Sequence, residues 1–522
     1  MTAVAQHEFI TLDEILHHWA TTQPDAPALE GSGQRYTYGE IEVLTRRIIA
    51  LFAARGIAPG DRVAFLGKND PAYGLMLCAC MRYGAVMAPV GWRLAPPEIA
   101  YILRDTGAKL LIATDAFMDS AGAAIASLDA PSLQLMSVAA MLDDMAGQEP
   151  ATYTPAGPDE AILQLYTSGT TGHPKGATLS NRNLCELRVE GLRAGLTYYT
   201  DYRAGDCMLV VMPIAHIGGT GSVMLGVQSG IRVVFEPEFT PDGVIDAITA
   251  GATHMFLVPA ALQFVIQHPR AAATDFSNLR YFIYGAAPMP LELLKQAVAT
   301  MPTTQFLQAY GMTETTGTIS ILPPEDHSTE GNQRMRSAGK ALPGVRIEVR
   351  GADNVEVPRG TIGEVCIRSP SNTAGYWQQP EATAKTIDPN GWLHTGDAGI
   401  MDDDGYVYIQ DRIKDMIISG GENVYPAEVE SAIYGHPAIA EVAVIGIPSA
   451  KWGEEVKACV VAKPGHVVDE SDVIAWARER IAAFKAPKSV DVIPAMPRNA
   501  SGKILRRELR APYWEGMDRQ VS

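Results

Sequence analysis

The segment that decides how this chain is interpreted is Tyr166-Thr-Ser-Gly-Thr-Thr-Gly-His-Pro-Lys-Gly-Ala177, which follows an apolar strand expected at Ile162–Leu165. Its twelve positions hold four serine or threonine hydroxyls, three glycines and one lysine. Glycines let successive backbone N–H groups face one anion, the hydroxyls add donors, and Lys175 adds a positive charge. The segment therefore predicts a polyphosphate-binding loop, with a plain surface turn as the alternative. The expected phosphate contacts are Thr167, Ser168, Gly169, Thr170, Thr171, Gly172 and Lys175.

The loop differs from the Walker A motif, in which Gly-Lys-Ser/Thr runs directly into a helix. Here Pro174 precedes the lysine, and the residues that follow, Ala177-Thr-Leu-Ser180, have an extended pattern. We therefore expect the loop to join two extended segments.

The composition is that of a globular protein with about three to four structural units in 522 residues. Hydrophobic residues make up 47% and charged residues 19%, which excludes a disordered chain. The net charge of −17 argues against a nucleic-acid binder, because such proteins present a basic surface. The six cysteines lack zinc-ligand spacing, no signal sequence is recognisable, and no apolar run approaches the ~20 residues that span a bilayer. These features predict a reduced, cytoplasmic protein without a transmembrane segment.

Short apolar segments alternate with stretches of helical length over roughly the first two thirds of the chain. Strands are expected at Val63–Leu66 and Leu110–Ala113, and helices at Ala72–Arg82 and Leu291–Ala299. Such alternation predicts an α/β fold of parallel, doubly wound sheets with helices on both faces. Further strands are expected at Val210–Met212, Arg232–Phe235 and Tyr281–Tyr284.

From about residue 340, β-rich pieces separated by Gly, Asp and Pro predict a small antiparallel sheet or β-barrel-like subdomain. After Asp411 a compact α+β pattern begins. We therefore expect a large N-terminal domain over residues 1–410 and a small C-terminal domain over residues 411–522. The β-rich pieces are Gly344–Arg350, Gly363–Arg368 and Gly405–Ile409, and the C-terminal elements are Pro426–Tyr434, Val442–Ile447, Val456–Ala462 and Glu470–Phe484.

Six motifs in the same order resemble those of the AMP-forming adenylate enzymes. This superfamily contains acyl- and aryl-CoA synthetases, carrier-loading adenylation domains and luciferases, and its signature loop is similar to residues 166–177. The resemblance spans essentially the whole chain, so coincidence is negligible. The other five motifs are Tyr284-Gly-Ala-Ala-Pro288, Gln308-Ala-Tyr-Gly-Met-Thr-Glu314, Gly391-Trp-Leu-His-Thr-Gly-Asp397, Asp411-Arg-Ile-Lys-Asp-Met-Ile-Ile-Ser-Gly-Gly-Glu-Asn423 and Pro497-Arg-Asn-Ala-Ser-Gly-Lys503.

The resemblance implies a site for ATP. In the family the carboxylate at the position of Glu314 holds the Mg²⁺ that bridges the phosphates, as suits a hard cation that prefers oxygen ligands. Asp397 is implied to accept both ribose hydroxyls, Tyr310 to stack on adenine, and Arg412 to reach the ribose. Outside the motifs, such residues are more often turn, packing or surface residues. The remaining nucleotide contacts implied are Gly285, Ala286, Ala287, Gly311 and Thr313.

Lys503 is the residue expected to carry adenylation, although most lysines are ordinary surface residues. A substrate carboxylate attacks the α-phosphate of ATP, and a cation placed between these two anions offsets their repulsion. The expected catalytic set is Lys503, Glu314 and Lys175.

The resemblance also implies that the C-terminal domain is mobile, with Lys414 as its hinge. This domain first presents Lys503, and it then rotates to place Gly420 and Gly421 beside the acyl-adenylate. Because glycines have no side chain, the thiol arm of CoA can pass close to the backbone there. The alternative is a simple turn without a catalytic role.

An acyl pocket is expected near His216, which lies in Pro213-Ile-Ala-His-Ile-Gly-Gly-Thr220 and matches a pocket-bordering position of the family. A packed core histidine is the alternative. Gly218 and Gly219 leave room for something larger than acetate, and Tyr284 is expected to line the same cavity.

The leading hypothesis is an ATP- and Mg²⁺-dependent acid:CoA ligase (AMP-forming) that activates a medium- or long-chain fatty acid. Aromatic and steroid side-chain acids fit the same pattern, and an acid:carrier-protein ligase is the alternative enzyme. Only 19 residues (522 − 503) follow Lys503, so a fused carrier domain is not expected. A catalytically inactive ATP- or acyl-binding sensor is the hypothesis from another class, and the intact catalytic motifs argue against it. The expected partners are the acid, ATP and CoA, and the oligomeric state stays open, with a homodimer among the alternatives.

Overall fold

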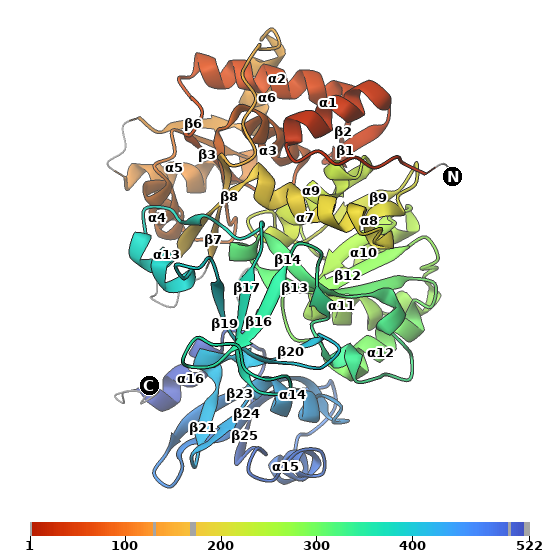
Figure 1. The fold of residues 1–522 in the computed structure, drawn as a ribbon, viewed down its shortest axis with the longest axis vertical. Coiled ribbons are helices and arrows are strands. Elements are labelled where there is room, and N and C mark those ends of the chain that lie inside the picture. Colours follow the sequence, from red (N-terminus) through yellow and green to blue (C-terminus); the bar gives the residue numbers. More distant parts are fainter. Residues whose placement is uncertain (1–2, 129–131, 168–173, 499–502, 516–522) are drawn as a thin grey trace.

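The chain folds into a large N-terminal α/β domain and a small C-terminal domain, which lie at opposite ends of the long axis in Figure 1. The structure is a computed structural model that describes residues 3–128, 132–167, 174–498 and 503–515. These residues form four β-sheets. The α/β class predicted from the alternation of strands and helices is thereby confirmed.

One sheet of the N-terminal domain has seven strands in the order β18-β8-β7-β4-β3-β5-β6. Strands β3 to β7 are parallel where they pair, and β8 and β18 are antiparallel to their neighbours. The loop singled out in the sequence joins β7 to β8, as expected for a connection between two extended segments. The strands are β3 (Arg62–Leu66), β4 (Val86–Val90), β5 (Leu110–Ala113), β6 (Gln134–Ser137), β7 (Ala161–Thr167), β8 (Lys175–Ser180) and β18 (Gly375–Tyr376).

A second sheet has nine strands in the order β15-β14-β13-β12-β11-β9-β10-β1-β2, with a parallel centre and antiparallel strands at both edges. The strand expected at Val210–Met212 lies earlier, because the chain leaves the sheet after Val210 on its way to the turn at Pro213. The strands are β1 (Pro27–Gly31), β2 (Gln34–Thr37), β9 (Cys207–Val210), β10 (Arg232–Phe235), β11 (His254–Leu257), β12 (Tyr281–Gly285), β13 (Gln305–Met312), β14 (Gly317–Leu322) and β15 (Lys340–Ala341).

Helix α3 (Pro71–Tyr83) packs between the two sheets, where it contacts β1 of one sheet and β4 and β7 of the other. Asp70 caps its N-terminus by accepting a hydrogen bond from the N–H of Ala72, and Pro71 occupies the first turn. Residues Pro71 to Arg82 are all buried, which explains why this helix is apolar on every side. It fixes the relative position of the two sheets, whose strand ends carry the site described below.

Most other helices of the N-terminal domain lie around these sheets (Figure 1), whereas α9 packs against α3, where the hydroxyls of Tyr73 and Thr220 are 2.6 Å apart. Helix α1 is capped at its N-terminus by Thr11, whose side chain accepts from the N–H of Glu14. Among the described residues, no helix combines the length and apolar character needed to cross a bilayer. These helices are α1 (Leu12–Thr22), α2 (Tyr38–Ala54), α4 (Pro96–Thr106), α5 (Met118–Ala126), α6 (Val138–Ala146), α7 (Asn181–Arg193), α8 (Thr197–Thr200), α9 (Ile217–Gln228), α10 (Pro241–Thr249), α11 (Pro259–Ile266), α12 (Leu291–Thr300) and α13 (Pro380–Thr386).

A small antiparallel sheet connects the large sheets to the C-terminal domain, as the β-rich pieces predict. Its strands are β16 (Arg346–Arg350), β17 (Gly363–Arg368), β19 (Leu393–Met401) and β20 (Val407–Arg412), in that order. The domain boundary expected between residues 410 and 411 falls within β20, so its position stays a prediction.

The C-terminal domain has its own sheet and its own buried core. The helix expected at Glu470–Phe484 ends at Arg478, because the N–H groups of both Arg480 and Ile481 turn back to the carbonyl of Ala477. The elements are β21 (Ile417–Ser419), β22 (Glu422–Val424), α14 (Pro426–Tyr434), β23 (Ile439–Ser449), β24 (Gly453–Ala462), α15 (Glu470–Arg478), β25 (Ser489–Val492) and α16 (Arg506–Trp514).

Candidate active site

Residues from three sheets meet at the ends of β7, β13 and β19. The carboxylate of Glu314 lies in a 3₁₀ turn (Thr313–Thr315) directly after β13 and is 4% exposed. Its Oε1 accepts hydrogen bonds from the hydroxyl of Tyr376 at 2.7 Å and from Oγ1 of Thr167 at 3.3 Å. Thr167 is the last residue before the glycine-rich loop, so the buried carboxylate and the start of that loop are neighbours.

Lys175, at the other end of the loop, also lies beside Tyr376. Its Nζ is 5.1 Å from the centre of the Tyr376 ring, over its face. Burial, and then the charge of Glu314, raises the pKa of the Tyr376 hydroxyl, so it stays a donor at neutral pH. The loop residues Ser168, Gly169, Thr170, Thr171 and Gly172 lie outside the described residues.

A second buried carboxylate, Asp397 on β19, holds Tyr310 and Arg412. The hydroxyl of Tyr310 donates to Oδ2 at 2.7 Å, and Nε of Arg412 is 2.8 Å from Oδ1. The strand pairing of β19 with β20 places Asp397 directly opposite Arg412. Burial, and then the charge of Asp397, raises the pKa of Tyr310 well above its ordinary value. The pKa of Arg412 is raised overall. Burial alone would lower it, but the charge of Asp397 and of its other anionic neighbours more than offsets that effect.

Lys503 belongs to the same electrostatic environment although it comes from the end of the chain. Its side chain keeps contact with solvent, but the surrounding protein atoms and then the charge of Arg412 lower its pKa. Asp397 and Glu314 act on it in the opposite direction. The structure therefore brings the C-terminal lysine to the carboxylates of the N-terminal domain. Residues 499–502, which precede it in the motif, lie outside the described residues.

The backbone segments between these side chains approach one another very closely. A Cβ added at Gly285 would lie 2.0 Å from the carbonyl oxygen of Ala309, and one at Gly311 would lie 1.6 Å from that of Gly317. Only glycine allows these contacts, which bring the ends of β12, β13 and β14 together. Ala286 follows in a left-handed conformation with φ 63° and is exposed, whereas Ala287 and Thr313 are half-buried beside it.

A cavity of about 210 Å³ begins at these strand ends and extends between α9 and the face of β11, β12 and β13. Gly218 lines it, as predicted. Gly219 and Tyr284 are not among its lining residues: a Cβ at Gly219 would lie 2.4 Å from the carbonyl oxygen of Pro213, and Tyr284 packs in the core with its hydroxyl 3.0 Å from Nε2 of His327. The lining includes Ile217, Gly218, Gly221, Phe256, Tyr281, Ile283, Ala286, Leu307, Ala309, Gly311 and Gly317.

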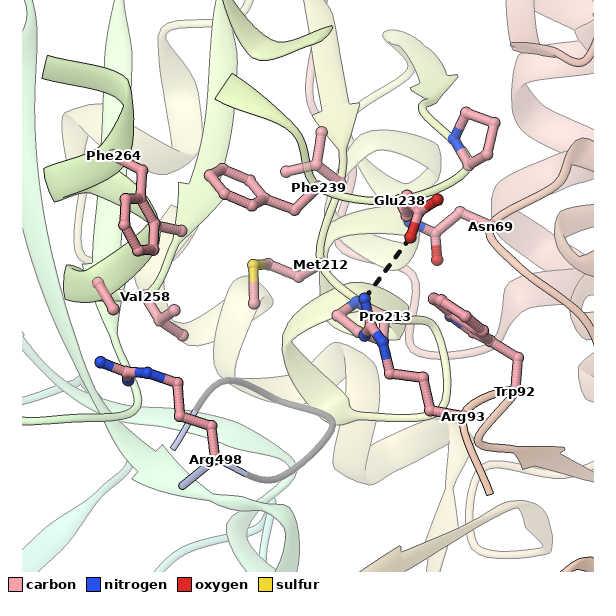
Figure 2. A pocket seen from close by; sticks show the side chains of 14 residues that line it. Asn69, Trp92, Arg93, Met212, Pro213, Glu238, Phe239, Val258, Phe264 and Arg498 are labelled. Atoms are coloured by element: carbon pink, nitrogen blue, oxygen red, sulfur yellow. Dashed lines mark ion pairs between the residues drawn. The ribbon is translucent and has the colours of Figure 1, made fainter. Parts of the chain in front are cut away.

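A second cavity, also of about 210 Å³, lies at the junction with the C-terminal domain (Figure 2). Apolar side chains such as Met212 and Phe239 form one part of it, while Arg498 approaches from the C-terminal domain. On its opposite side Arg93 is 3.7 Å from the carboxylate of Glu238. Nearby, the side-chain amide of Gln263 on α11 donates to the carbonyl of Ala440, a contact between the two domains.

His216 lies between the two cavities. Met212 and Pro213 before it line the second cavity, and Ile217 and Gly218 after it line the first. Burial, and then the charges of Lys503 and Arg93, lowers the pKa of His216 to about 4, so the ring is neutral at pH 7. The two cavities and Lys503 thus meet at this histidine.

The hinge predicted at Lys414 lies in an exposed 3₁₀ turn (Ile413–Asp415) directly after β20. Ion pairs connect this turn to the helix that follows Lys503. Arg510 on α16 is 3.0 Å from Asp415, and Arg506 is 2.8 Å from Glu430 and 3.8 Å from Asp411.

Gly420 and Gly421 form the tight turn between β21 and β22 in the C-terminal domain. Both have positive φ, 64° and 85°, and both are exposed. Figure 1 places β21 far from the strand ends of the N-terminal domain that carry Glu314. Like Gly219 and Tyr284, these two glycines are predicted site residues that the structure does not bring to the predicted place.

The structure adds residues that sequence reasoning did not single out. Tyr376 comes from β18, which pairs with β8 across about 200 residues of chain, so only the pairing connects it to Lys175. Arg188 and His254 line the far end of the first cavity and lie in no motif. For Arg188, the signal in the sequence was a charged residue between two apolar ones, Leu187 and Val189, on a helix that is otherwise amphipathic.

Fold and site together are those of an adenylate-forming enzyme, with two buried carboxylates and a lysine of the C-terminal domain beside a largely apolar cavity. The chain matches the AMP-binding enzyme family over residues 16–377 and the AMP-binding enzyme C-terminal domain over residues 428–503. It therefore belongs to the AMP-binding enzyme family and is an AMP-forming acid–thiol ligase, for which ATP is a substrate.

Curated relatives align with it over nearly their whole length. Fatty acid–[acyl-carrier-protein] ligase ScoC of Streptomyces coeruleorubidus is 40% identical, with 98% of each chain covered. Feruloyl-CoA synthase of an Amycolatopsis species is 39% identical over 95% of this chain and 97% of its own. Long-chain-fatty-acid–CoA ligase FadD13 of Mycobacterium tuberculosis is 38% identical over 96% and 98%. The class of reaction is common to these relatives, whereas the acid and the thiol differ.

Among solved structures, ATP-bound MatB from Rhodopseudomonas palustris superposes with a TM-score of 0.86, at 32% identity over 96% of this chain and 99% of its own. The apo structure of MatB superposes with a TM-score of 0.77, at 31% identity over 97% and 99%. The arrangement of this chain is therefore more similar to that of the ATP-bound structure.

Proposed function

We propose that this protein is an ATP-dependent carboxylic acid:CoA ligase that activates a fatty acid of medium to long chain length. The observation that carries the choice of acid is the shape of the first cavity. It follows β12 from Ala286 back to Tyr281, and the five steps between these residues, at a rise of about 3.3 Å each, span roughly 16 Å. An elongated cavity of this kind, lined largely by apolar side chains, suits an extended acyl chain.

In the first half-reaction the acid lies with its carboxylate at the Ala286 and Gly311 end of the cavity. One carboxylate oxygen attacks the α-phosphorus of ATP, the bond to the β-phosphate oxygen breaks, and pyrophosphate leaves. Lys503 lies between the two anions and offsets their repulsion, which is the largest contribution that a single side chain makes here. The lowered pKa of Lys503 is consistent with a position among other cations and partly out of water.

The nucleotide is held by residues whose present partners are replaced when it binds. Asp397 accepts the ribose hydroxyls, Arg412 lies beside them, and Tyr310 packs on the adenine. The described edges of the glycine-rich loop, Thr167 and Lys175, contact the phosphates together with its remaining residues. The higher TM-score with the ATP-bound relative supports this arrangement of the two domains.

The chemistry at Glu314 fits Mg²⁺. Its carboxylate is buried and lies beside the hydroxyl of Thr167, and such hard oxygen donors are the ligands that Mg²⁺ prefers. When bound, the ion would neutralise negative charge on the phosphates as pyrophosphate leaves. The hydroxyl of Tyr376 orients the carboxylate for this task.

In the second half-reaction the thiol of CoA attacks the carbonyl carbon of the acyl-adenylate. The carbon–sulfur bond forms, AMP leaves with the electrons of the carbon–oxygen bond, and the thiol proton is released. We propose that the second cavity admits the thiol, because it reaches His216 from the side opposite to the acyl chain. Rotation about Lys414 would bring the Gly420–Gly421 turn toward this entrance.

Pyrophosphate release measured over a panel of carboxylic acids tests the proposal, followed by detection of the acyl-CoA by mass spectrometry. We expect kcat/KM to be highest for acids whose chain is of medium length, and CoA to accept the acyl group. A protein that activates only acetate or only compact aromatic acids would contradict the proposal.

A second candidate is an acid:carrier-protein ligase, because the relative ScoC is named as such a ligase at 40% identity. The same acyl-adenylate would then pass to the phosphopantetheine thiol of a separate carrier. Offering CoA and a purified carrier in parallel separates the two candidates, since each predicts that only its own acceptor becomes acylated at a rate matching pyrophosphate release.

A further inference from the structure

The far end of the acyl cavity differs chemically from its beginning. Strands β11 and β12 are parallel, and their first residues, His254 and Tyr281, are paired. Because the carboxylate end of the cavity lies at the opposite ends of these strands, His254 and Tyr281 mark where the tail of the acid would lie. The ring of His254 is stacked between the rings of Tyr202 and Tyr281, with both centroid distances 5.2 Å.

A buried arginine reaches the same end from α7. Arg188 lines the cavity and is 5% exposed. Its Nη1 donates to the carbonyl of His7 at 3.2 Å, and its Nη2 donates to the side-chain oxygen of Gln6. The segment that carries these two acceptors lies behind the cavity, since the N–H of Val4 also donates to the carbonyl of Tyr202.

Both polar side chains retain hydrogen-bonding capacity. Nε of Arg188 and Nε2 of His254 are buried and have no hydrogen-bond partner among the described residues. No carboxylate in the described part of the chain lies within ion-pair distance of Arg188. Its two acceptors are neutral, so the positive charge is uncompensated. Burial accordingly lowers the pKa of Arg188.

His254 is neutral at neutral pH and uses only one ring nitrogen. Burial, and then the charge of Arg280, lowers its pKa to about 3. Its Nδ1 is 2.8 Å from the hydroxyl of Thr253, which leaves Nε2 for another group. A buried cation and a buried imidazole with unused nitrogens are costly in an apolar pocket unless a ligand supplies the missing partner.

We propose that Arg188 and His254 are specificity-determining residues that recognise an oxygen atom at the tail of the acid. The preferred substrate is then an extended acid whose far end carries a hydroxyl, carbonyl or carboxylate oxygen, not a plain alkyl chain. This inference rests on the proposed function and names the substrate class of that same cavity. A site built to bind a polar group rejects the analogue that lacks it, because its own polar atoms are left unpaired.

The test compares acids of equal length that differ only at the tail: decanoic, 10-hydroxydecanoic and decanedioic acid. The readout is kcat/KM for pyrophosphate release by the full-length protein. We expect at least one oxygen-ended acid to exceed decanoic acid by about tenfold or more. The stronger of the two reports whether the recognised oxygen is neutral or charged. Equal or better use of decanoic acid would overturn the inference.

Two substitutions locate the preference in the named residues. Arg188→Met keeps the length of the side chain without its donors, and His254→Phe keeps the ring stack without the nitrogens. Each should lower kcat/KM for the preferred oxygen-ended acid by about tenfold and leave that for decanoic acid unchanged. A purely structural role would lower all the acids equally and would refute the assignment. If Arg188→Met does not fold, His254→Phe decides by the same readout.

The matched control is Arg193→Met, on the same helix, where the arginine is exposed and paired with Glu8 and Glu190. It should not change the preference. Failure of the proposed function gives a different result: no acid in the panel would support pyrophosphate release. Turnover of decanoic acid without preference for an oxygen at the tail would remove only the present inference.

Discussion

The two ends of the substrate site are built in opposite ways. At the nucleotide end the two buried carboxylates have partners among the described residues: Asp397 has Tyr310 and Arg412, and Glu314 accepts from Tyr376 and Thr167. At the tail end Arg188 and His254 keep nitrogens without a partner among the described residues. Groups that are paired within the protein hold a rigid geometry, and ATP binds by replacing some of their partners. Groups without a partner instead favour an acid that supplies one. The difference indicates that the nucleotide end determines the reaction and the tail end determines the acid.

The largest effect is expected from Lys503→Ala, which removes the cation of the nucleotide end. Acid-dependent exchange between ATP and pyrophosphate should fall by roughly 100- to 1000-fold, the range for loss of one charge-stabilising group. Thioester formation from supplied acyl-adenylate should be spared, because that step does not join two anions. Lys385→Ala, at an exposed position on α13, serves as the control. Equal loss of both half-reactions would contradict the division of roles.

Asp397→Ala removes the acceptor that orders two other residues. We expect KM for ATP to rise and the free energy of unfolding to fall by about 1–3 kcal/mol, because the buried hydroxyl of Tyr310 and the Arg412 guanidinium lose their partner. Denaturant unfolding and ATP titration measure the two effects. Asp403→Ala, in an exposed turn, should change neither.

Gly221→Leu tests the cavity without disturbing the fold. Gly221 lines the cavity on α9, and no heavy atom lies within 4 Å of a Cβ added there. The leucine should occupy part of the acyl path and lower kcat/KM for the longest acids by about tenfold, while the shortest acids and the KM for ATP are retained. Gly221→Ala is the matched control and should raise the free energy of unfolding by about 0.5–1 kcal/mol. Unchanged chain-length selectivity in Gly221→Leu would place the acyl chain elsewhere.

The smallest effect at neutral pH is expected at the tail end, where His254 makes the free energy of unfolding depend on pH. The pKa of His254 is lowered from 6.5 to about 3, so the folded protein resists protonation that the unfolded chain accepts. The contribution of His254 to the free energy of unfolding is fully present above pH 6.5. It decreases as the pH falls toward 3, by at most about 1.4 kcal/mol per pH unit. His254→Phe should therefore show a shallower acid decline of unfolding free energy than the wild type. Identical pH profiles would show that this imidazole is not buried as described.

Much of the nucleotide end could be predicted from the sequence because its chemistry is local. Each motif keeps its residues within a few positions of one turn, so the resemblance of the motifs to those of a known family implied the roles of Glu314 and Asp397. Tyr376 was not, because a strand pairing across about 200 residues brings it to Glu314.

The acyl cavity was the part that sequence reasoning described least well. Along β12, Tyr281 and Ile283 face the cavity, whereas Phe282 and Tyr284 face the core. The left-handed φ of Ala286 then interrupts the alternation, so Ala286 lines the cavity although Tyr284, two positions before it in the same motif, faces the core. Arg188 lies on α7 and His254 at the start of β11, two elements without any motif, and only their common position in the lining of the cavity reveals them.

The segment behind Arg188 has a consequence for how this enzyme could diversify. Gln6 and His7 lie behind Arg188 at the tail end, and they are held by a few hydrogen bonds to α7 and α9. Substituting a few residues near the start of the chain would change the depth or the charge of the tail end, while the groups that bind ATP stay in place. Changes in a short segment near the start of the chain could thus give activity toward new acids without altering the residues that bind ATP.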